Sequence, residues 1–221
     1  RSGRPGLYTA LVTARGADGA VVRTPVTFEI EAPEHELTIT TGALPGVPAD
    51  RTYMFAYVVN LDDPAVFAAT VYAPAGESAS VTVPAGRYSV MASYGSFTGN
   101  EADDAAALVG DPDVAVGAAT TVSLDPARAR RLSSTVDGVA TEASAVGVTF
   151  IQTARRGPEW SDYAFAWGEA ARKWNVYLAG NDGAGIGHFR AIASFGLRAP
   201  DRFYDILHTR EKVPADPTYR V

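Results

Sequence analysis

The chain has 221 residues, of which 47% are hydrophobic, and a formal net charge of −6. This apolar content is too high for a wholly disordered chain, and the acidic balance opposes nucleic-acid binding, which usually needs a basic face. The sequence contains no cysteine, which excludes disulfides, cysteine metal sites and cysteine nucleophiles.

The sequence shows no membrane-spanning segment. No apolar run approaches the roughly 20 residues that a helix needs to cross a bilayer. The opening stretch, 1–5, lacks the apolar core of a signal peptide.

The first segment has the pattern of a β-hairpin. Over 7–14, leucine and threonine at the odd positions alternate with tyrosine, alanine and valine at the even positions, and a second strand is expected over 21–30. Asp18-Gly19 between them is a strong hairpin signal. Pro25 predicts an edge position or a bulge. Because a lone hairpin is only marginally stable, we interpret residues 1–32 as the terminal hairpin of a truncated β-sandwich whose other strands lie upstream.

The second segment, residues 33–127, is predicted to be a complete β-sandwich. Short stretches with period-two alternation are separated by turn residues, and Met54–Leu61 is a dense apolar run typical of a buried strand. Several short strands with turns between them are typical of a β-sandwich.

The third segment, residues 128–221, is predicted to be an aromatic-rich β module. Strands are expected over 146–150, 163–167, 174–178 and 189–197. The last residues, 214–221, read as an extended loop, so we expect an incomplete module with an unpaired strand edge. The predicted fold class is therefore all-β, with tandem sandwich modules of which the first and last are truncated.

Aromatic residues of the third segment are the candidate binding residues. They are Trp160, Tyr163, Trp167 and Trp174. Exposed aromatic rings stack on sugars or anchor a peptide, whereas aromatics at period two also commonly form core or cross-strand pairs. Both interpretations stay open at this point.

Two pairs of neighbouring carboxylates are candidate calcium ligands. They are Asp62 with Asp63 and Asp103 with Asp104. Calcium takes 6–8 oxygen ligands, so neither pair is sufficient alone, and solvated turns are the simpler interpretation. No other cofactor is expected.

No catalytic residue is predicted. The histidines, His35, His188 and His208, lie far apart in unrelated contexts and show no zinc-binding spacing. Ser89-Val90-Met91 resembles part of the nucleophile block of subtilisin-type peptidases. In this chain, however, the serine lies in a predicted strand, without a named base or orienting partner, so we expect it on the surface of that strand.

Three regions of the chain resemble known families. Gly6–Ala14 with Arg23–Phe28 looks like the end of an immunoglobulin- or fibronectin-type sandwich. Pro48-Ala49 with Val83–Val90 resembles a carboxypeptidase-regulatory-type module.

The third region gives the most specific resemblance. Tyr204–Arg210 with Val213–Val221 is similar to a segment of long secreted actinobacterial peptidases of the subtilisin family, downstream of their catalytic domain. This resemblance implies a non-catalytic accessory region of a secreted serine endopeptidase, acting as a spacer or in substrate or surface binding. Its partner would be the upstream peptidase domain.

An alternative function fits the aromatic residues. The chain would then be a carbohydrate-binding or adhesion module of a cell-surface protein. Its ligand would be a protein or a cell-wall glycan. Both interpretations predict a secreted, extracellular protein.

Overall fold

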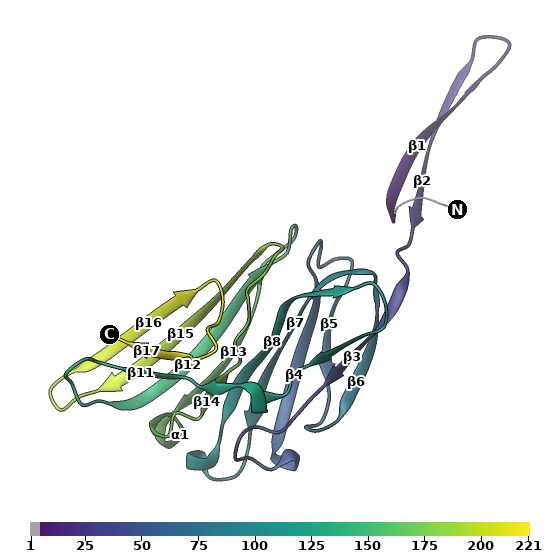
Figure 1. Cartoon of the computed structure of the whole chain (residues 1–221). Helices are drawn as coiled ribbons and strands as arrows, with labels where there is room; N and C mark the ends of the chain where they lie inside the picture. Colours follow the sequence, from purple (N-terminus) through teal and green to yellow (C-terminus); the bar gives the residue numbers. More distant parts are fainter. Residues whose placement is uncertain (1–4) are drawn as a thin grey trace.

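A computed structural model describes residues 5–221. Residues 1–4 belong to the predicted hairpin segment and to the opening stretch 1–5 discussed above, and they lie outside the described residues. Strands β1 (Gly6–Arg15) and β2 (Val21–Ile30) form an antiparallel hairpin that projects from the rest of the chain (Figure 1). The predicted hairpin is confirmed.

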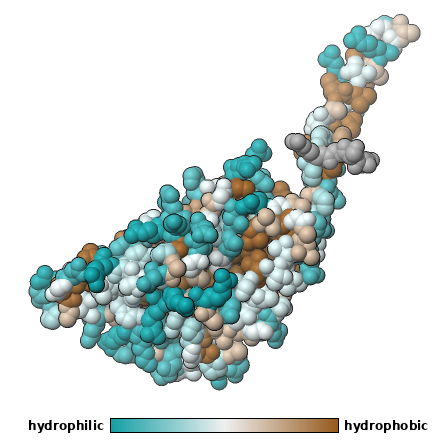
Figure 2. Space-filling view, viewed as in Figure 1, coloured by the Kyte–Doolittle hydropathy of each residue, from teal (hydrophilic) through white to brown (hydrophobic). Residues whose placement is uncertain are grey.

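One face of this hairpin is apolar. The register places Tyr8 opposite Phe28, with their rings stacked at 5.4 Å, and Ala10 opposite Val26. Hydrophobic residues are accordingly visible along the exposed hairpin in Figure 2. That residues 1–32 belong to a truncated sandwich stays a prediction.

Most of the remaining strands form three stacked β layers. The middle sheet has six strands in the order β10-β14-β8-β7-β4-β5. Their bounds are β4 Thr52–Asn60, β5 Ala68–Tyr72, β7 Gly86–Ser96, β8 Ala106–Val116, β10 Arg130–Arg131 and β14 Val176–Leu178.

Two smaller sheets cover the middle sheet. The β3 sheet has the order β6-β3-β9, with β3 Glu34–Thr40, β6 Ser78–Pro84 and β9 Thr120–Ser123. The β12 sheet has the order β13-β12-β15-β16, with β12 Glu142–Thr153, β13 Trp160–Trp167, β15 His188–Arg198 and β16 Phe203–Arg210.

Few other elements are present among residues 5–221. A parallel pair joins β11 (Ser133–Thr135) to β17 (Thr218–Arg220). The helical turns are η1 Ala49–Arg51, η2 Glu101–Asp103, η3 Pro126–Arg128 and α1 Gly168–Arg172. Within this range no helix has the length and hydropathy needed to cross a membrane.

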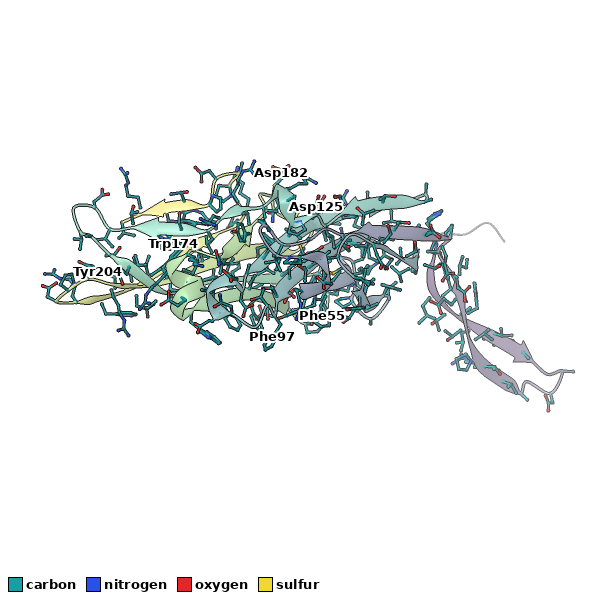
Figure 3. All side chains as sticks on the ribbon, turned by 90° about the horizontal axis from the view of Figure 1, so that it is seen from below. Phe55, Phe97, Asp125, Trp174, Asp182 and Tyr204 are labelled. Atoms are coloured by element: carbon teal, nitrogen blue, oxygen red, sulfur yellow. The ribbon has the colours of Figure 1, made fainter. Side chains whose placement is uncertain are left out.

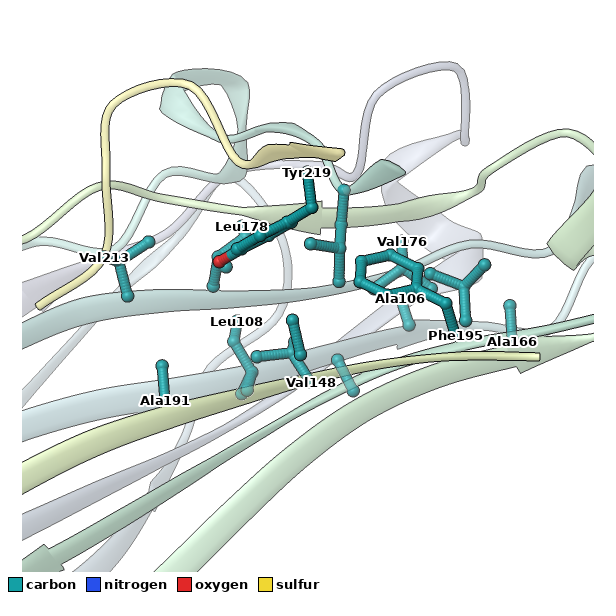
Figure 4. Packing of buried hydrophobic residues seen from close by; sticks show 14 of the residues in the cluster. Ala106, Leu108, Val148, Ala166, Val176, Leu178, Ala191, Phe195, Val213 and Tyr219 are labelled. Atoms are coloured by element: carbon teal, nitrogen blue, oxygen red, sulfur yellow. The ribbon is translucent and has the colours of Figure 1, made fainter. Parts of the chain in front are cut away.

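Each face of the middle sheet packs into a separate hydrophobic core. Toward the β3 sheet, Val90 of β7 joins Leu37 and Ile39 of β3. On the opposite face, Met91 and Leu108 pack with the inward residues of the β12 sheet. Val148 and Phe195 are two of these inward residues, and Figure 4 shows them together with Leu108. Burial on both faces explains why β7 is almost continuously buried.

The predicted all-β sandwich class is confirmed, with one sheet shared between two sandwiches. Strands β10 and β14 come from the predicted third segment, yet they complete the middle sheet beside β8. The boundary predicted between residues 127 and 128 therefore falls between strands of a shared sheet. The division into these two segments, with the last one incomplete, stays a prediction.

Two local expectations differ from the structure. The expected loop over 214–221 contains β17, because Tyr219 is buried in the core against Phe195. Ser89, expected on the strand surface, is fully buried in β7. Its hydroxyl donates a 2.7 Å hydrogen bond to Oε1 of Gln152 on β12, and so joins the two sheets.

Candidate functional site: an aromatic groove

The floor of the site is the uncovered face of β4. Tyr53, Phe55 and Tyr57 alternate with buried residues and are 37–44% exposed. Strand β13, at the end of the β12 sheet, packs against β7 and β8. The β12 sheet therefore leaves this face of β4 uncovered, and its aromatic side chains stay open to solvent.

The wall of the site is β13 itself. Its outward side chains include Tyr163, Phe165 and Trp167, which are 59%, 43% and 61% exposed. Their rings form a stack, with centroids 5.4 Å apart between Tyr163 and Phe165 and 4.5 Å apart between Phe165 and Trp167. The stack makes a continuous aromatic ridge along the strand.

Floor and wall enclose a groove of about 490 Å³, which we call the aromatic groove. Its aromatic lining consists of Tyr53, Phe55, Tyr57, Tyr94, Tyr163, Phe165 and Trp167. Ala170 of α1 and Glu101 of η2 also line the groove. The volume lies within the range of roughly 300–1,000 Å³ that is common for ligand sites.

Cross-strand neighbours hold the floor rings in place. Tyr53 lies opposite Gly95 of β7, and a Cβ atom at Gly95 would collide with the Tyr53 ring. Phe55 packs against Tyr72 of β5 with ring centroids 6.0 Å apart. Phe55 and Phe97 lie along the same side of the body in Figure 3.

Asp162 is the most unusual polar group in the aromatic groove. Its Oδ1 accepts a 2.8 Å hydrogen bond from the backbone N–H of Tyr163, whereas Oδ2 is buried and has no hydrogen-bond partner among residues 5–221. Burial raises the pKa of Asp162. The Tyr163 N–H and the nearby Ser93 hydroxyl oppose the rise, although Ser93 forms no hydrogen bond of normal geometry with the carboxyl group.

Two further carboxylates line the groove. Asp104 Oδ1 accepts hydrogen bonds of 2.8 Å from both the backbone N–H and the hydroxyl of Thr98, so it has a structural role. The Glu101 carboxylate lies directly beside Gly168, at the start of α1. The lining residues include no lysine, arginine or histidine.

The structure brings together two of the four predicted aromatic residues. Tyr163 and Trp167 line the groove, but Trp160 is half-buried at the other end of β13 and is not among the lining residues. Trp174 is not in the groove either, because its backbone adopts φ 56° after α1 and its ring packs toward Phe195 in the core.

Sequence reasoning missed the groove floor. Tyr53 directly precedes the apolar run Met54–Leu61, and Phe55 and Tyr57 lie within it, so the density of this run predicts a buried strand and hides the exposed face. The aromatic side chains at period two were the available signal.

The candidate calcium ligands have protein partners. Asp62 lies 3.3 Å from an Arg155 nitrogen, and Asp103 lies 3.3 Å from Lys173 Nζ. Asp63 accepts from the backbone N–H of Ala65, and no cluster of three or more histidine or acidic side chains suited to a metal occurs among residues 5–221. Calcium binding stays a prediction.

Comparisons with known proteins give little further information. No family model and no curated protein matches the chain. The chain is similar to the crystal structure of a candidate adhesin from Bacteroides ovatus, at 9% identity and a TM-score of 0.31, covering 85% of this chain and 89% of that one. It is also similar to a candidate cell adhesion protein from Parabacteroides distasonis, at 10% identity and a TM-score of 0.25, covering 81% and 82%. With scores this low, these matches carry no functional conclusion.

Proposed function

We propose that this chain is an adhesion module of a secreted or cell-surface protein and that it binds its partner in the aromatic groove. The observation that carries the proposal is the convergence of exposed aromatic side chains from two different sheets on one groove. Exposed apolar patches of this kind mark interaction sites, and tyrosine and tryptophan are the residues most enriched at binding hot spots.

The chemistry of the groove suits binding more than catalysis. Its polar side chains carry carboxylates and the hydroxyls of serine and tyrosine, and the lining residues hold no imidazole that could act as a base beside a nucleophile. Ser89 lies elsewhere, with its hydroxyl bonded to Gln152. We therefore propose a non-catalytic role for the described residues.

An accessory role beside a subtilisin-family peptidase is a second proposal, supported by the sequence resemblance at Tyr204–Arg210 and Val213–Val221. In that setting the aromatic groove would deliver substrate or attach the enzyme to a surface. The gene sequence on both sides of the chain tests this proposal, because an upstream Ser-Met-Ala block in a glycine-rich context would identify the parent enzyme.

A binding survey tests the adhesion proposal. The labelled chain is applied to cell-wall glycans, a glycan array and a peptide array, alongside Tyr163→Ala, Trp167→Ala and the matched control Phe203→Ala. Phe203 is 56% exposed on β16, at the opposite edge of the β12 sheet. We expect each groove variant to weaken binding by about tenfold and the control to leave it unchanged. Equal binding by all three variants would contradict the proposal.

A further inference from the structure

The backbone of β13 forms part of the groove wall. Side chains along a strand alternate between two faces, yet every residue from Asp162 to Trp167 lines the aromatic groove. An unbroken run of lining residues means that the edge of the strand, and not one of its faces, is turned toward the groove. The sheet order agrees, because β13 pairs with β12 on one side only.

The hydrogen bond at Tyr163 indicates which backbone groups face the groove. The Tyr163 N–H donates to Asp162 Oδ1, so it is directed away from β12. In an antiparallel pair the N–H and C=O of one residue point to the same side, and this side alternates from residue to residue. The C=O of Tyr163, both backbone groups of Phe165 and the N–H of Trp167 therefore face the groove. Beyond the β12 ladder, residues 5–221 supply none of them with a backbone hydrogen bond.

The stacking of the ridge disfavours a sugar as the occupant. A sugar ring binds an aromatic residue by lying on a free face of its ring. Tyr163 and Trp167 stack on Phe165 with interplanar angles of 18° and 28°, so both faces of Phe165 are occupied. Only the outer faces of Tyr163 and Trp167, at the two ends of the stack, are free of ring contacts. Between these ends the ridge offers ring edges, which suit the side chains of a polypeptide lying along the strand.

The charge of the groove indicates the composition of the occupant. Its ionisable lining residues, apart from tyrosines, are Glu101, Asp104 and Asp162, with no cationic side chain among them. A partner segment carrying lysine or arginine would be electrostatically complementary, and such cations also interact favourably with aromatic rings.

We propose that the occupant of the aromatic groove is an extended, basic segment of another protein, which adds to the free edge of β13 as a new strand of the β12 sheet. Main-chain hydrogen bonds to Phe165 fix its register. Its side chains point alternately toward the ring edges of the ridge and toward Tyr53, Phe55 and Tyr57 on the floor. This inference rests on the proposed adhesion function, since it names the class of partner for the same groove.

Synthetic peptides of about ten residues test the inference, because that is the length of a long strand. Lysine or arginine alternates with valine, threonine or tyrosine in these probes, and matched sets carry glutamate in place of the basic residues or N-methyl groups on alternate backbone nitrogens. We expect the basic peptides to bind, and glutamate or N-methyl groups to weaken binding by about tenfold or more.

A pair of variants isolates the backbone contribution. Phe165→Ala removes the ring, and Phe165→Pro removes the ring together with the N–H that faces the groove. Proline is tolerated on an edge strand whose N–H points away from the ladder, and thermal unfolding verifies that both variants fold. We expect Phe165→Pro to bind basic peptides about fivefold more weakly than Phe165→Ala does, which corresponds to one hydrogen bond.

The outcomes separate this inference from the proposed function. If glycans bind in a manner that depends on Tyr163 and Trp167 while basic peptides do not bind, the inference is wrong and the adhesion proposal stands. Equal binding of basic, acidic and N-methylated peptides would also overturn the inference. If neither glycans nor peptides respond to the groove variants, both proposals fail.

Discussion

Replacing Ser89 by alanine tests whether the two sheets are joined as the structure shows. The Ser89 hydroxyl of β7 donates to Gln152 Oε1 of β12 at 2.7 Å, and Gln152 Nε2 donates to the carbonyl oxygen of Pro112 at 2.7 Å. Ser89 is fully buried and Gln152 is 2% exposed. Solvent therefore cannot replace a lost partner.

The expected cost follows from this burial. Ser89→Ala leaves the Gln152 carbonyl without its donor, which lowers the free energy of unfolding by about 1–3 kcal/mol. For a chain of this size that corresponds to a fall in Tm of roughly 2–12 °C. Gln152→Met orphans both the Ser89 hydroxyl and the Pro112 carbonyl, so its cost should be larger, about 2–5 kcal/mol.

A double-mutant cycle tests whether Ser89 and Gln152 interact. Urea unfolding monitored by tryptophan fluorescence gives the free energy of each variant, with an unchanged m-value as the check on a common mechanism. We expect the Ser89→Ala and Gln152→Met double variant to be less destabilised than the sum of the single variants, by about 1–2 kcal/mol. Strictly additive effects would mean that Ser89 and Gln152 do not interact, and the packing of β7 against β12 would have to be revised.

Three further predictions concern the groove and the hairpin. Gly95→Ala places a methyl group where the Tyr53 ring lies, so it should weaken ligand binding by about tenfold, whereas Gly117→Ala, whose new Cβ meets open space, should not; equal binding would contradict the assigned position of the Tyr53 ring. Because burial raises the pKa of Asp162, the folded state holds its proton more readily than the unfolded state, and the associated stability is present at low pH and lost as pH rises through the raised pKa. Asp162→Asn should therefore lose less stability than the parent chain between about pH 3 and 7 in urea titrations, and parallel curves would refute this. Residues of the β1–β2 hairpin are almost all exposed, so a chain that begins at Pro33 should keep the Tm of the parent within about 2 °C; a larger fall would show that the hairpin packs on the body.

The individual strands could be predicted from the sequence because their signals are local. Period-two alternation located the hairpin at Asp18-Gly19 and the strands around Tyr163–Trp167. Alternation also indicated that Tyr163 and Trp167 share one face of a strand.

The pairing of distant strands could not be predicted in the same way. Strand β14 lies beside β8 although about seventy residues separate them in the chain, and no local pattern encodes that neighbour. The shared middle sheet, and with it the boundary between segments, depends on such pairings. The burial of Tyr219 likewise depends on β17 reaching β11.

The aromatic groove exists because the β12 sheet ends at β13 and leaves part of the middle sheet uncovered. Tyr53, Phe55 and Tyr57 would form a core if β13 had a further neighbour to cover them. Their exposure is a property of the sheet order. Trp174 differs from these exposed residues. It is one of the predicted aromatic binding residues, but its left-handed backbone conformation directs its ring toward the core.

Hydrogen exchange provides the most direct test of partner binding in the aromatic groove. The strongest binder from the glycan and peptide surveys is added, and amide exchange is followed along the whole chain. We predict new protection over 160–167 of β13 and over 52–60 of β4, with little change in the β1–β2 hairpin or in β16. Protection confined to the hairpin, or to the β3 sheet on the opposite side of the body, would contradict binding in the groove.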